Sequence, residues 1–176
     1  MKKIFTLTLL AILGMSSAVA DDYVLYSGEI TEGDYIIYYD GKAMNTTVDK
    51  NRLQFLEVTP ENNKISNPDA AIIWKIAKNG DYYTLYNSSA SKYAASTGTK
   101  NQATVTETVD DKALWTISGE ETYEIVNKGN AAANVNSNLR NNGTYGFACY
   151  STSTGGALSL YKLNEGGDDI VIAPDR

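Results

Sequence analysis

The sequence repeats a Tyr- and Ile-rich pattern three times at nearly regular spacing. Gly33–Tyr39 reads GDYIIYY, and Gly80–Tyr86, which begins 47 residues later, reads GDYYTLY. Glu121–Asn127 reads ETYEIVN and begins after a further 41 residues. Each run alternates in polarity and is rich in β-branched and aromatic residues, which is typical of a β-strand. A chain made of three similar units has few ways to fold, because each unit must bury its apolar face against the others.

Each unit also ends on a similar short segment. The three segments have the form apolar–aromatic–polar–apolar and are Ile73–Ile76, Leu114–Ile117 and Leu160–Leu163. Their aromatic residues are Trp74, Trp115 and Tyr161. Because the neighbouring residues are apolar, we expect one aromatic side chain per unit to fill a shared core. The alternative interpretation makes these rings exposed platforms that stack on sugars.

Two weaker strand candidates lie between the ends of each unit. They are residues 42–46 and 53–58, residues 92–96 and 103–108, and residues 134–140 and 145–150. The segments that link them are rich in Asn, Ser, Gly and Asp, as turns require. No segment shows sustained helical periodicity. The sequence therefore predicts an all-β fold with about four short strands in each of three units.

Three four-stranded units restrict the architecture further. A propeller typically needs at least four blades, and an open solenoid needs polar capping repeats, which we do not find in the sequence. We therefore predict a β-trefoil, a barrel with pseudo-threefold symmetry, with an irregular β-sandwich as the alternative. The expected domain spans residues 21–163, with repeats at about 33–79, 80–120 and 121–163. Residues 164–176 are expected to form a tail or linker.

The N-terminus has the pattern of a secretory signal peptide. Lys2 and Lys3 are followed by an apolar run at 4–14, and Ala18-Val19-Ala20 is a small–x–small cleavage pattern. We expect cleavage near Ala20, so that residues 1–20 are removed from an exported bacterial protein in the periplasm or outside the cell. No later stretch is long enough to span a bilayer. Loss of the two lysines changes the net charge from −6 to −8.

Composition excludes several classes of chemistry. The chain has no histidine, which rules out Ser-His-Asp and Cys-His nucleophiles and His-ligated metals. The one cysteine, Cys149, permits no internal disulfide and has apolar neighbours, so we expect a buried thiol. An acidic chain is a poor binder of nucleic acid. We expect a monomer that is not an enzyme, with no metal and no cofactor.

The second unit, from Asp81 to Ile117, resembles one repeat of a ricin-type β-trefoil lectin. It reads DYYTLYNSSASKYAASTGTKNQATVTETVDDKALWTI: a strand, a small polar turn, two further strands and an aromatic residue near the end. The resemblance extends from about residue 23 to 163 and implies a β-trefoil fold with carbohydrate binding. Two positions depart from the family. The Gln of its closing Gln-x-Trp motif is replaced by Ile72, Ala113 and Ser159, and its sugar-binding Asp by Asn45, Ala95 and Asn136.

Candidate binding residues are the amides and phenols of the predicted turns, which suit ligands rich in hydroxyl groups. The densest patch lies in the third unit, and the corresponding turns of the other units contribute fewer residues. The full set is Asn134, Asn136, Asn138, Arg140 and Tyr145 in the third unit, Asp40 and Asn45 in the first, and Asn87 and Tyr93 in the second. A structural interpretation competes with this one, because Asn, Gly and Ser also simply build hairpins.

The sequence thus predicts a secreted, non-catalytic module that binds carbohydrate. The alternative is a module that binds protein, such as an accessory or inhibitor domain associated with secreted hydrolases. A sugar site predicts a concave surface with Tyr beside Asn or Asp, whereas a protein site predicts a protruding loop or an exposed apolar patch. The sequence identifies neither the ligand nor the number of working sites.

Overall fold

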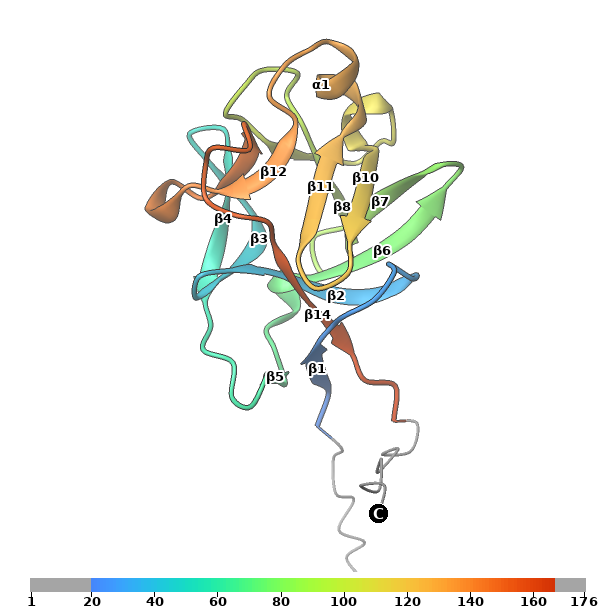
Figure 1. The fold of residues 1–176 in the computed structure, drawn as a ribbon, viewed down its shortest axis with the longest axis vertical. Helices are drawn as coiled ribbons and strands as arrows, with labels where there is room; N and C mark the ends of the chain where they lie inside the picture. Colours follow the sequence, from blue (N-terminus) through green and yellow to red (C-terminus); the bar gives the residue numbers. More distant parts are fainter. Residues whose placement is uncertain (1–19, 167–176) are drawn as a thin grey trace, which may run out of the picture.

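The computed structural model describes residues 20–166, which form short antiparallel β-strands with little helix (Figure 1). The predicted signal peptide, apart from Ala20, and residues 167–176 of the predicted tail lie outside the described residues. Both ends of the described chain lie at the same end of the molecule, at the bottom of Figure 1.

Twelve of the strands form three units of four. The first unit has β2 (Gly33–Tyr39), β3 (Lys42–Asp49), β4 (Arg52–Glu57) and β6 (Ile73–Asn79). The second has β7 (Tyr82–Asn87), β8 (Lys92–Ala95), β9 (Thr104–Thr106) and β10 (Trp115–Gly119). The third has β11 (Tyr123–Asn127), β12 (Asn138–Asn141), β13 (Phe147–Tyr150) and β14 (Ser159–Leu163). The prediction of an all-β chain with three four-stranded units is confirmed.

The first and last strands of the units close a six-stranded barrel. Strand β2 pairs with β6, β6 with β7, β7 with β10, and β10 with β11. The ring closes where Tyr123 of β11 bridges to Leu158 and where β14 pairs with β2. Closure leaves no free edge within the barrel, which removes the usual site of strand-to-strand aggregation.

The middle strands of each unit form a hairpin, and the three hairpins meet. They pair as β3–β4, β8–β9 and β12–β13. Backbone hydrogen bonds join them: the amide of Asn101 donates to the carbonyl of Cys149 over 2.8 Å, and that of Ala103 donates to the carbonyl of Asn51 over 2.9 Å. Strand β13 also pairs with β4 through Phe147 and Leu53. The hairpins therefore cover one end of the barrel.

The remaining elements decorate this frame. Strand β1 (Asp22–Leu25) pairs with β14, and β5 (Lys64–Ser66), from the connection between β4 and β6, pairs with β1. The helical turns are η1 (Ala70–Ile72), η2 (Asp111–Ala113), α1 (Lys128–Ala132) and η3 (Gly143–Tyr145). The connection that carries β5 lengthens the first unit relative to the second.

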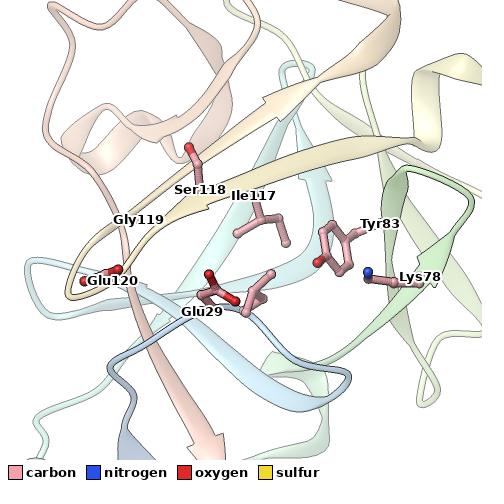
Figure 2. A pocket seen from close by; sticks show the side chains of 8 residues that line it. Glu29, Lys78, Tyr83, Ile117, Ser118, Gly119 and Glu120 are labelled. Carbon is pink, nitrogen blue, oxygen red and sulfur yellow. The ribbon is translucent and has the colours of Figure 1, made fainter.

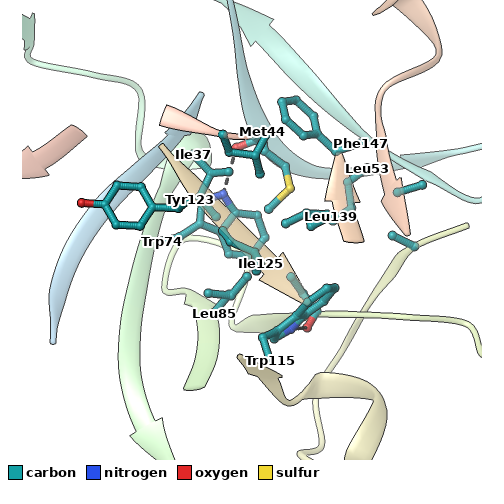
Figure 3. Close-up of a cluster of buried hydrophobic side chains, with 14 of the residues drawn as sticks. Ile37, Met44, Leu53, Trp74, Leu85, Trp115, Tyr123, Ile125, Leu139 and Phe147 are labelled. Carbon is teal, nitrogen blue, oxygen red and sulfur yellow. Dashed lines mark hydrogen bonds between the residues drawn. The ribbon is translucent and has the colours of Figure 1, made fainter. Parts of the chain in front are cut away.

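The barrel and hairpins enclose one main hydrophobic core (Figure 3). Trp74 and Trp115 are fully buried in it, as predicted. The indole N–H of Trp74 donates to the carbonyl of Met44 over 2.9 Å, and that of Trp115 donates to the carbonyl of Ala94 over 3.1 Å. Each indole thus binds the second strand of its own unit and satisfies its one polar atom without water.

The prediction that Tyr161 is the third member of this set is wrong. Trp74 pairs with Tyr35, Trp115 with Tyr83, and the equivalent bridge in the third unit joins Leu158 to Tyr123. Leu158 is fully buried in the main core, whereas Tyr161 is buried in a second cluster that includes Tyr23 of β1. Leu158 has no aromatic ring, so the sequence pattern pointed to the next aromatic residue along the strand.

The same pairing corrects the repeat spacing by one residue. Tyr35, Tyr83 and Tyr123 are equivalent, which gives offsets of 48 and 40 residues in place of 47 and 41. In this register Ile37, Leu85 and Ile125 occupy the same position, and all three are fully buried. A one-residue slip moves each side chain to the opposite face of a strand, so only the corrected register places matching residues in the core.

Burial also accounts for the single cysteine. Cys149 is fully buried in the core, and this burial raises the pKa of its thiol to about 12. A thiolate is therefore strongly disfavoured in the folded protein, which makes Cys149 an inert core residue.

Candidate functional site

The structure divides the predicted patch of the third unit among three places. Asn134 and Asn136 line a cavity at the loop that follows α1. Asn138 and Arg140 lie on β12 and bind to Glu124 of β11. Tyr145 lies in η3, in the turn between β12 and β13. Residues that are close in sequence here do not form one surface, because the chain leaves the loop, enters a strand and then turns.

The cavity of Asn134 and Asn136 has a volume of about 380 Å³. One wall is the loop 134–136, and the other is Gly98, Thr99 and Lys100 of the turn between β8 and β9. The site therefore lies between the second and third units. We call it the amide cavity.

The loop wall of the amide cavity is fixed by buried asparagines. The Asn127 side chain caps α1 by accepting the amide N–H of Asn130 over 3.0 Å. The fully buried Asn130 side chain then donates to the carbonyl of Asn136 over 2.9 Å. Asn134 adopts a left-handed conformation with φ of +55°, which asparagine tolerates better than most residues. These contacts hold the loop in one shape before any ligand arrives.

The side chains of Asn134 and Asn136 remain available to a ligand. Asn134 is exposed and Asn136 is half-buried, and neither side-chain amide hydrogen-bonds to another of residues 20–166. A primary amide presents both a donor and an acceptor group, which matches a pair of neighbouring hydroxyls. The Thr99 hydroxyl and the Lys100 ammonium add further polar groups to the opposite wall.

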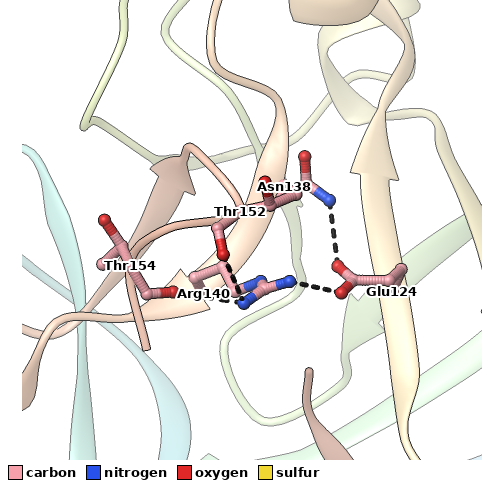
Figure 4. A network of polar contacts seen from close by, with 5 residues as sticks. All are labelled: Glu124, Asn138, Arg140, Thr152 and Thr154. Atoms are coloured by element: carbon pink, nitrogen blue, oxygen red, sulfur yellow. Dashed lines mark hydrogen bonds and ion pairs between the residues drawn. The ribbon is translucent and has the colours of Figure 1, made fainter. Parts of the chain in front are cut away.

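Arg140 has a structural role that the sequence did not reveal (Figure 4). Its guanidinium pairs with the Glu124 carboxylate and donates to the carbonyls of Thr152 and Thr154 over 3.3 and 3.2 Å. Asn138 donates to the second Glu124 oxygen over 2.9 Å. Arg140 is 4% exposed. The prediction that Arg140 contacts a ligand is therefore corrected, because its surface is covered and its charge is paired within the protein.

Tyr145 is the most exposed large apolar side chain among the described residues, at 63%. The Arg52 guanidinium lies 5.6 Å from the centre of its ring, and the Gln54 side chain donates to the Tyr145 carbonyl over 3.4 Å. Arg52 is itself held by a 3.0 Å hydrogen bond to the Tyr150 hydroxyl. The ring is thus supported by the neighbouring hairpin while most of its surface faces solvent.

Solved structures share this architecture, whereas no family model and no characterised protein sequence matches the chain. SeviL bound to asialo-GM1 saccharide superposes with a TM-score of 0.53 at 18% identity, over 75% of this chain and 98% of SeviL. The Polyporus squamosus lectin, bound to a human-type influenza-binding epitope, gives 0.55 at 15% identity over 77% of this chain and 50% of that one. Both are β-trefoil proteins. The chain is a β-trefoil.

A catalytic protein also contains a matching part. The endo-β-galactosidase of Clostridium perfringens that releases GlcNAcα1-4Gal gives a TM-score of 0.55 at 14% identity, over 74% of this chain. The match covers only 32% of that enzyme. This chain therefore spans about a third of the enzyme and half of the Polyporus lectin, and at such identities the likeness establishes the trefoil fold.

The trefoil register also relocates the positions compared with ricin-type repeats. In each unit, one residue of the second strand pairs with the equivalent position of the first strand. These second-strand residues are Ala43, Tyr93 and Asn138. The residue two positions later in the third unit is therefore Arg140, and not Asn136 as the sequence comparison assumed. Likewise Gly156, and not Ser159, stands two residues before Leu158. The motif positions of the family still lack Gln and Asp in every unit of the trefoil.

In the first unit, the structure separates Asp40 from Asn45. Asp40 is exposed in the turn between β2 and β3, where it has φ of +45°. Asn45 is 7% exposed, and its side-chain oxygen accepts the amide N–H of Thr47 over 3.0 Å, where the β3–β4 pairing shifts register. The prediction of a ligand contact at Asn45 is corrected, because this side chain shapes an irregular strand.

In the second unit, Asn87 is fully buried. Its side-chain nitrogen donates to the carbonyls of Ala71 and Ile73, both over 3.0 Å, and its oxygen accepts the amide N–H of Ala90 over 3.0 Å. The prediction of a ligand contact at Asn87 is also corrected, because no part of its side chain reaches solvent. Tyr93 is half-buried on β8, and its ring centre lies 4.8 Å from that of Tyr86.

The sequence did not predict a further cavity, which is larger than the amide cavity (Figure 2). It measures about 560 Å³ and lies where consecutive units join, at the barrel end away from the hairpins. Two carboxylates, Glu29 and Glu120, share its wall with Lys78 and Tyr83. These residues lie near the ends of barrel strands, and this shared position is the one feature of the sequence that could have indicated a common site. Taken singly, each charged residue is typical of an ordinary turn.

Two further observations concern residues 20–166 alone. They contain no group of three or more His, Cys, Asp and Glu side chains arranged to hold a metal ion. None of their helices has the length and apolar character needed to cross a membrane.

Proposed function

We propose that this trefoil is a carbohydrate-binding module that binds glycans through the polar turns of its third unit. The observation that carries the proposal is the amide cavity, where the free side chains of Asn134 and Asn136 face Thr99 across a preformed hollow. Two structurally similar proteins, SeviL and the Polyporus squamosus lectin, are bound to saccharides, which supports the same ligand class.

The geometry favours a shallow, polar mode of recognition. Side-chain amides bind adjacent sugar hydroxyls as donor and acceptor at once, and the fixed loop lowers the entropy lost on binding. Tyr145 supplies an exposed aromatic ring of the kind on which the apolar face of a sugar packs. Since Tyr145 lies on a separate turn, we propose it as a second contact surface.

We further propose that binding in the amide cavity is non-catalytic. Glycoside hydrolysis requires two carboxyl groups on either side of the scissile bond. None of the residues that line the amide cavity is Asp or Glu. The carboxylate of Glu124, the acidic member of the neighbouring network, is paired with Arg140 and Asn138.

A glycan array probed with the purified chain and two variants tests the binding proposal. Asn136→Ala removes one amide, and Asn134→Gly removes the other while keeping a residue that accepts positive φ. Asn79→Ala, at an exposed position of β6, is the matched control. We expect binding by the wild type and the control, with a clear loss in both cavity variants.

Two results would contradict this proposal. Binding that both cavity variants retain would move the sugar site elsewhere on the trefoil. An array without any signal, on protein whose circular dichroism shows that it is folded, would favour the alternative of a protein partner.

We also propose that the chain is exported and that residues 1–20 are removed. The support is the order of charged, apolar and small residues before Asp21. N-terminal sequencing of the protein recovered from a periplasmic or culture fraction tests this. The expected first residue is Asp21, and recovery of intact Met1 in the cytoplasm would contradict it.

A further inference from the structure

The amide cavity carries positive charge. Lys100 lines it directly. Lys112 lies behind the same wall: a Cβ placed on Gly98 would be 3.6 Å from Lys112 Cε and 3.8 Å from its Nζ. Both lysines are exposed, and they belong to different segments, the β8–β9 turn and η2. Two ammonium groups therefore flank the wall of Gly98, Thr99 and Lys100.

Nearby carboxylates are bound elsewhere. Asp110 caps η2, with its side-chain oxygen accepting the amide N–H of Lys112 over 2.9 Å. Asp111 forms an ion pair of 2.8 Å with Lys128. Neither Lys100 nor Lys112 forms an ion pair with another of residues 20–166. Their charges are thus available to a ligand in the cavity.

Other cavities of the trefoil differ in this respect. The cavity of about 560 Å³ contains Glu29 and Glu120 beside Lys78, and a cavity near β5 contains Glu61 beside Lys64. A cavity beside β1 has Lys162 without a carboxylate, but that ammonium donates to the Thr31 hydroxyl over 2.6 Å. On a chain with a net charge of −6, a cavity lined by the unpaired Lys100, with Lys112 behind the same wall and no carboxylate in its lining, is a specific feature.

We propose that the amide cavity recognises an anionic glycan, one that bears a carboxylate or a sulfate group. This inference rests on the proposed function and adds the substrate class. The anionic group lies toward Lys100 and Lys112, and the hydroxyls of the same or the adjoining sugar bind Asn134 and Asn136. A charged hydrogen bond is about twice as strong as a neutral one, so the acidic group sets the preference among glycans.

The test compares related glycans with and without an anionic group. Galactose- and N-acetylglucosamine-terminated glycans are each presented in neutral, sialylated or uronylated, and sulfated forms to the full chain. We expect the acidic members to bind about tenfold or more tightly than their neutral partners, as a hydrogen bond to a charged group predicts. Added salt should weaken the acidic members selectively, because exposed charges are screened.

Variants assign the preference to the two lysines. Lys100→Gln with Lys112→Gln should remove the roughly tenfold preference, so that acidic and neutral glycans bind this variant with equal affinity. Lys75→Gln is the charge-matched control, because Lys75 lies on β6 in a different cavity, beside Asp34. Comparison of the carboxylated and sulfated members identifies which anionic group is preferred.

Each other outcome overturns a defined part of the argument. Equal binding of neutral and acidic glycans, lost in Asn136→Ala, would overturn the anionic preference and keep the carbohydrate function. A preference for acidic glycans that survives the double lysine substitution would place the anion at another site. The absence of binding to every glycan would overturn both the inference and the proposed function.

Discussion

The buried guanidinium of Arg140 forms an ion pair with the partly exposed carboxylate of Glu124. The Arg140 side chain is 5% exposed and the Glu124 side chain 34%. Arg140 also donates to the carbonyls of Thr152 and Thr154, so the pair connects β11 and β12 to the segment that leads back to the barrel. The pair therefore fixes how the third unit returns to close the trefoil.

We predict that breaking this pair destabilises the fold. Glu124→Gln leaves a buried guanidinium without its counter-charge, and we expect a loss of about 2–3 kcal/mol, below the ~3–5 kcal/mol of a fully buried pair because Glu124 is partly exposed. Urea denaturation measures the free energy of unfolding. In the double variant with Arg140→Met the loss should be smaller than the sum of the single losses. Strict additivity of the two single losses would show that the pair contributes no coupling.

Two asparagines at equivalent positions yield a second stability prediction. Asn87 and Asn127 each end the first strand of a unit and donate to carbonyls of a closing turn, with distances of 3.0 Å to Ala71 and 2.7 Å to Lys112. Replacing either by Ala leaves buried backbone groups unsatisfied, so we expect a loss of about 1–3 kcal/mol for each.

The control for these two substitutions is Asn79→Ala. Asn79 is exposed on β6, and a surface change of this kind is expected to stay within about 0.5 kcal/mol. Thermal or urea unfolding of the three variants gives the comparison. Equal stabilities of Asn87→Ala and Asn79→Ala would refute a structural role for Asn87 and reopen its assignment as a ligand residue.

The fold was predictable because its signals recur. Alternating runs and buried tryptophans appear at matching places, and pseudo-threefold repetition leaves the trefoil as the simplest closed arrangement. The register was not predictable, because the adjacent Tyr82 and Tyr83 align equally well with Tyr35. The pairing of Trp115 with Tyr83 resolves the choice, and it depends on contacts between strands rather than on the sequence of either strand.

The candidate site was harder to predict, because asparagine serves both as an exposed binding residue and as a buried structural one. Asn134 and Asn87 look alike in a turn-rich sequence, yet the first is exposed at a cavity and the second is fully buried. The difference comes from which carbonyls lie within reach after folding. Lys112 illustrates the same limit, since its position beside Gly98 follows from the packing of η2 against the β8–β9 turn.

Buried phenols and the buried thiol predict sensitivity to alkali. Burial raises the pKa of Tyr23 and of Tyr123 to about 12, and burial does the same for Cys149. Between their ordinary pKa values and about 12, the folded chain holds more protons than the unfolded chain. The free energy of unfolding should therefore fall as pH rises through this range. Near neutral pH these groups stay protonated in both states, so they should cause no such fall there.

Tyr→Phe variants separate the two tyrosines in that experiment. Tyr23→Phe should lessen the decline in stability at alkaline pH with little effect at neutral pH. Tyr123→Phe should also lower stability at neutral pH, because it removes a 2.8 Å hydrogen bond to the carbonyl of Gly28. Unfolding curves at several pH values, with tyrosinate absorbance as a monitor, give the result. A decline that Tyr23→Phe leaves unchanged would refute the contribution of Tyr23.

The exposed ring of Tyr145 provides the last prediction, which concerns binding. If the ring packs against a sugar, Tyr145→Ala should weaken glycan binding by about 2- to 10-fold, the range expected for an aromatic contact of ~0.5–1.5 kcal/mol. Tyr145→Phe retains the ring and should retain most of the affinity. Stability should hardly change in either variant, because the side chain is 63% exposed.

Calorimetry with the best glycan from the array, on Tyr145→Ala alone and in an Asn136→Ala background, then separates two mechanisms. Additive losses indicate that the ring and the amide cavity make independent contacts. No loss in Tyr145→Ala would assign the ring to the support of the neighbouring hairpin, where Arg52 lies 5.6 Å from its centre.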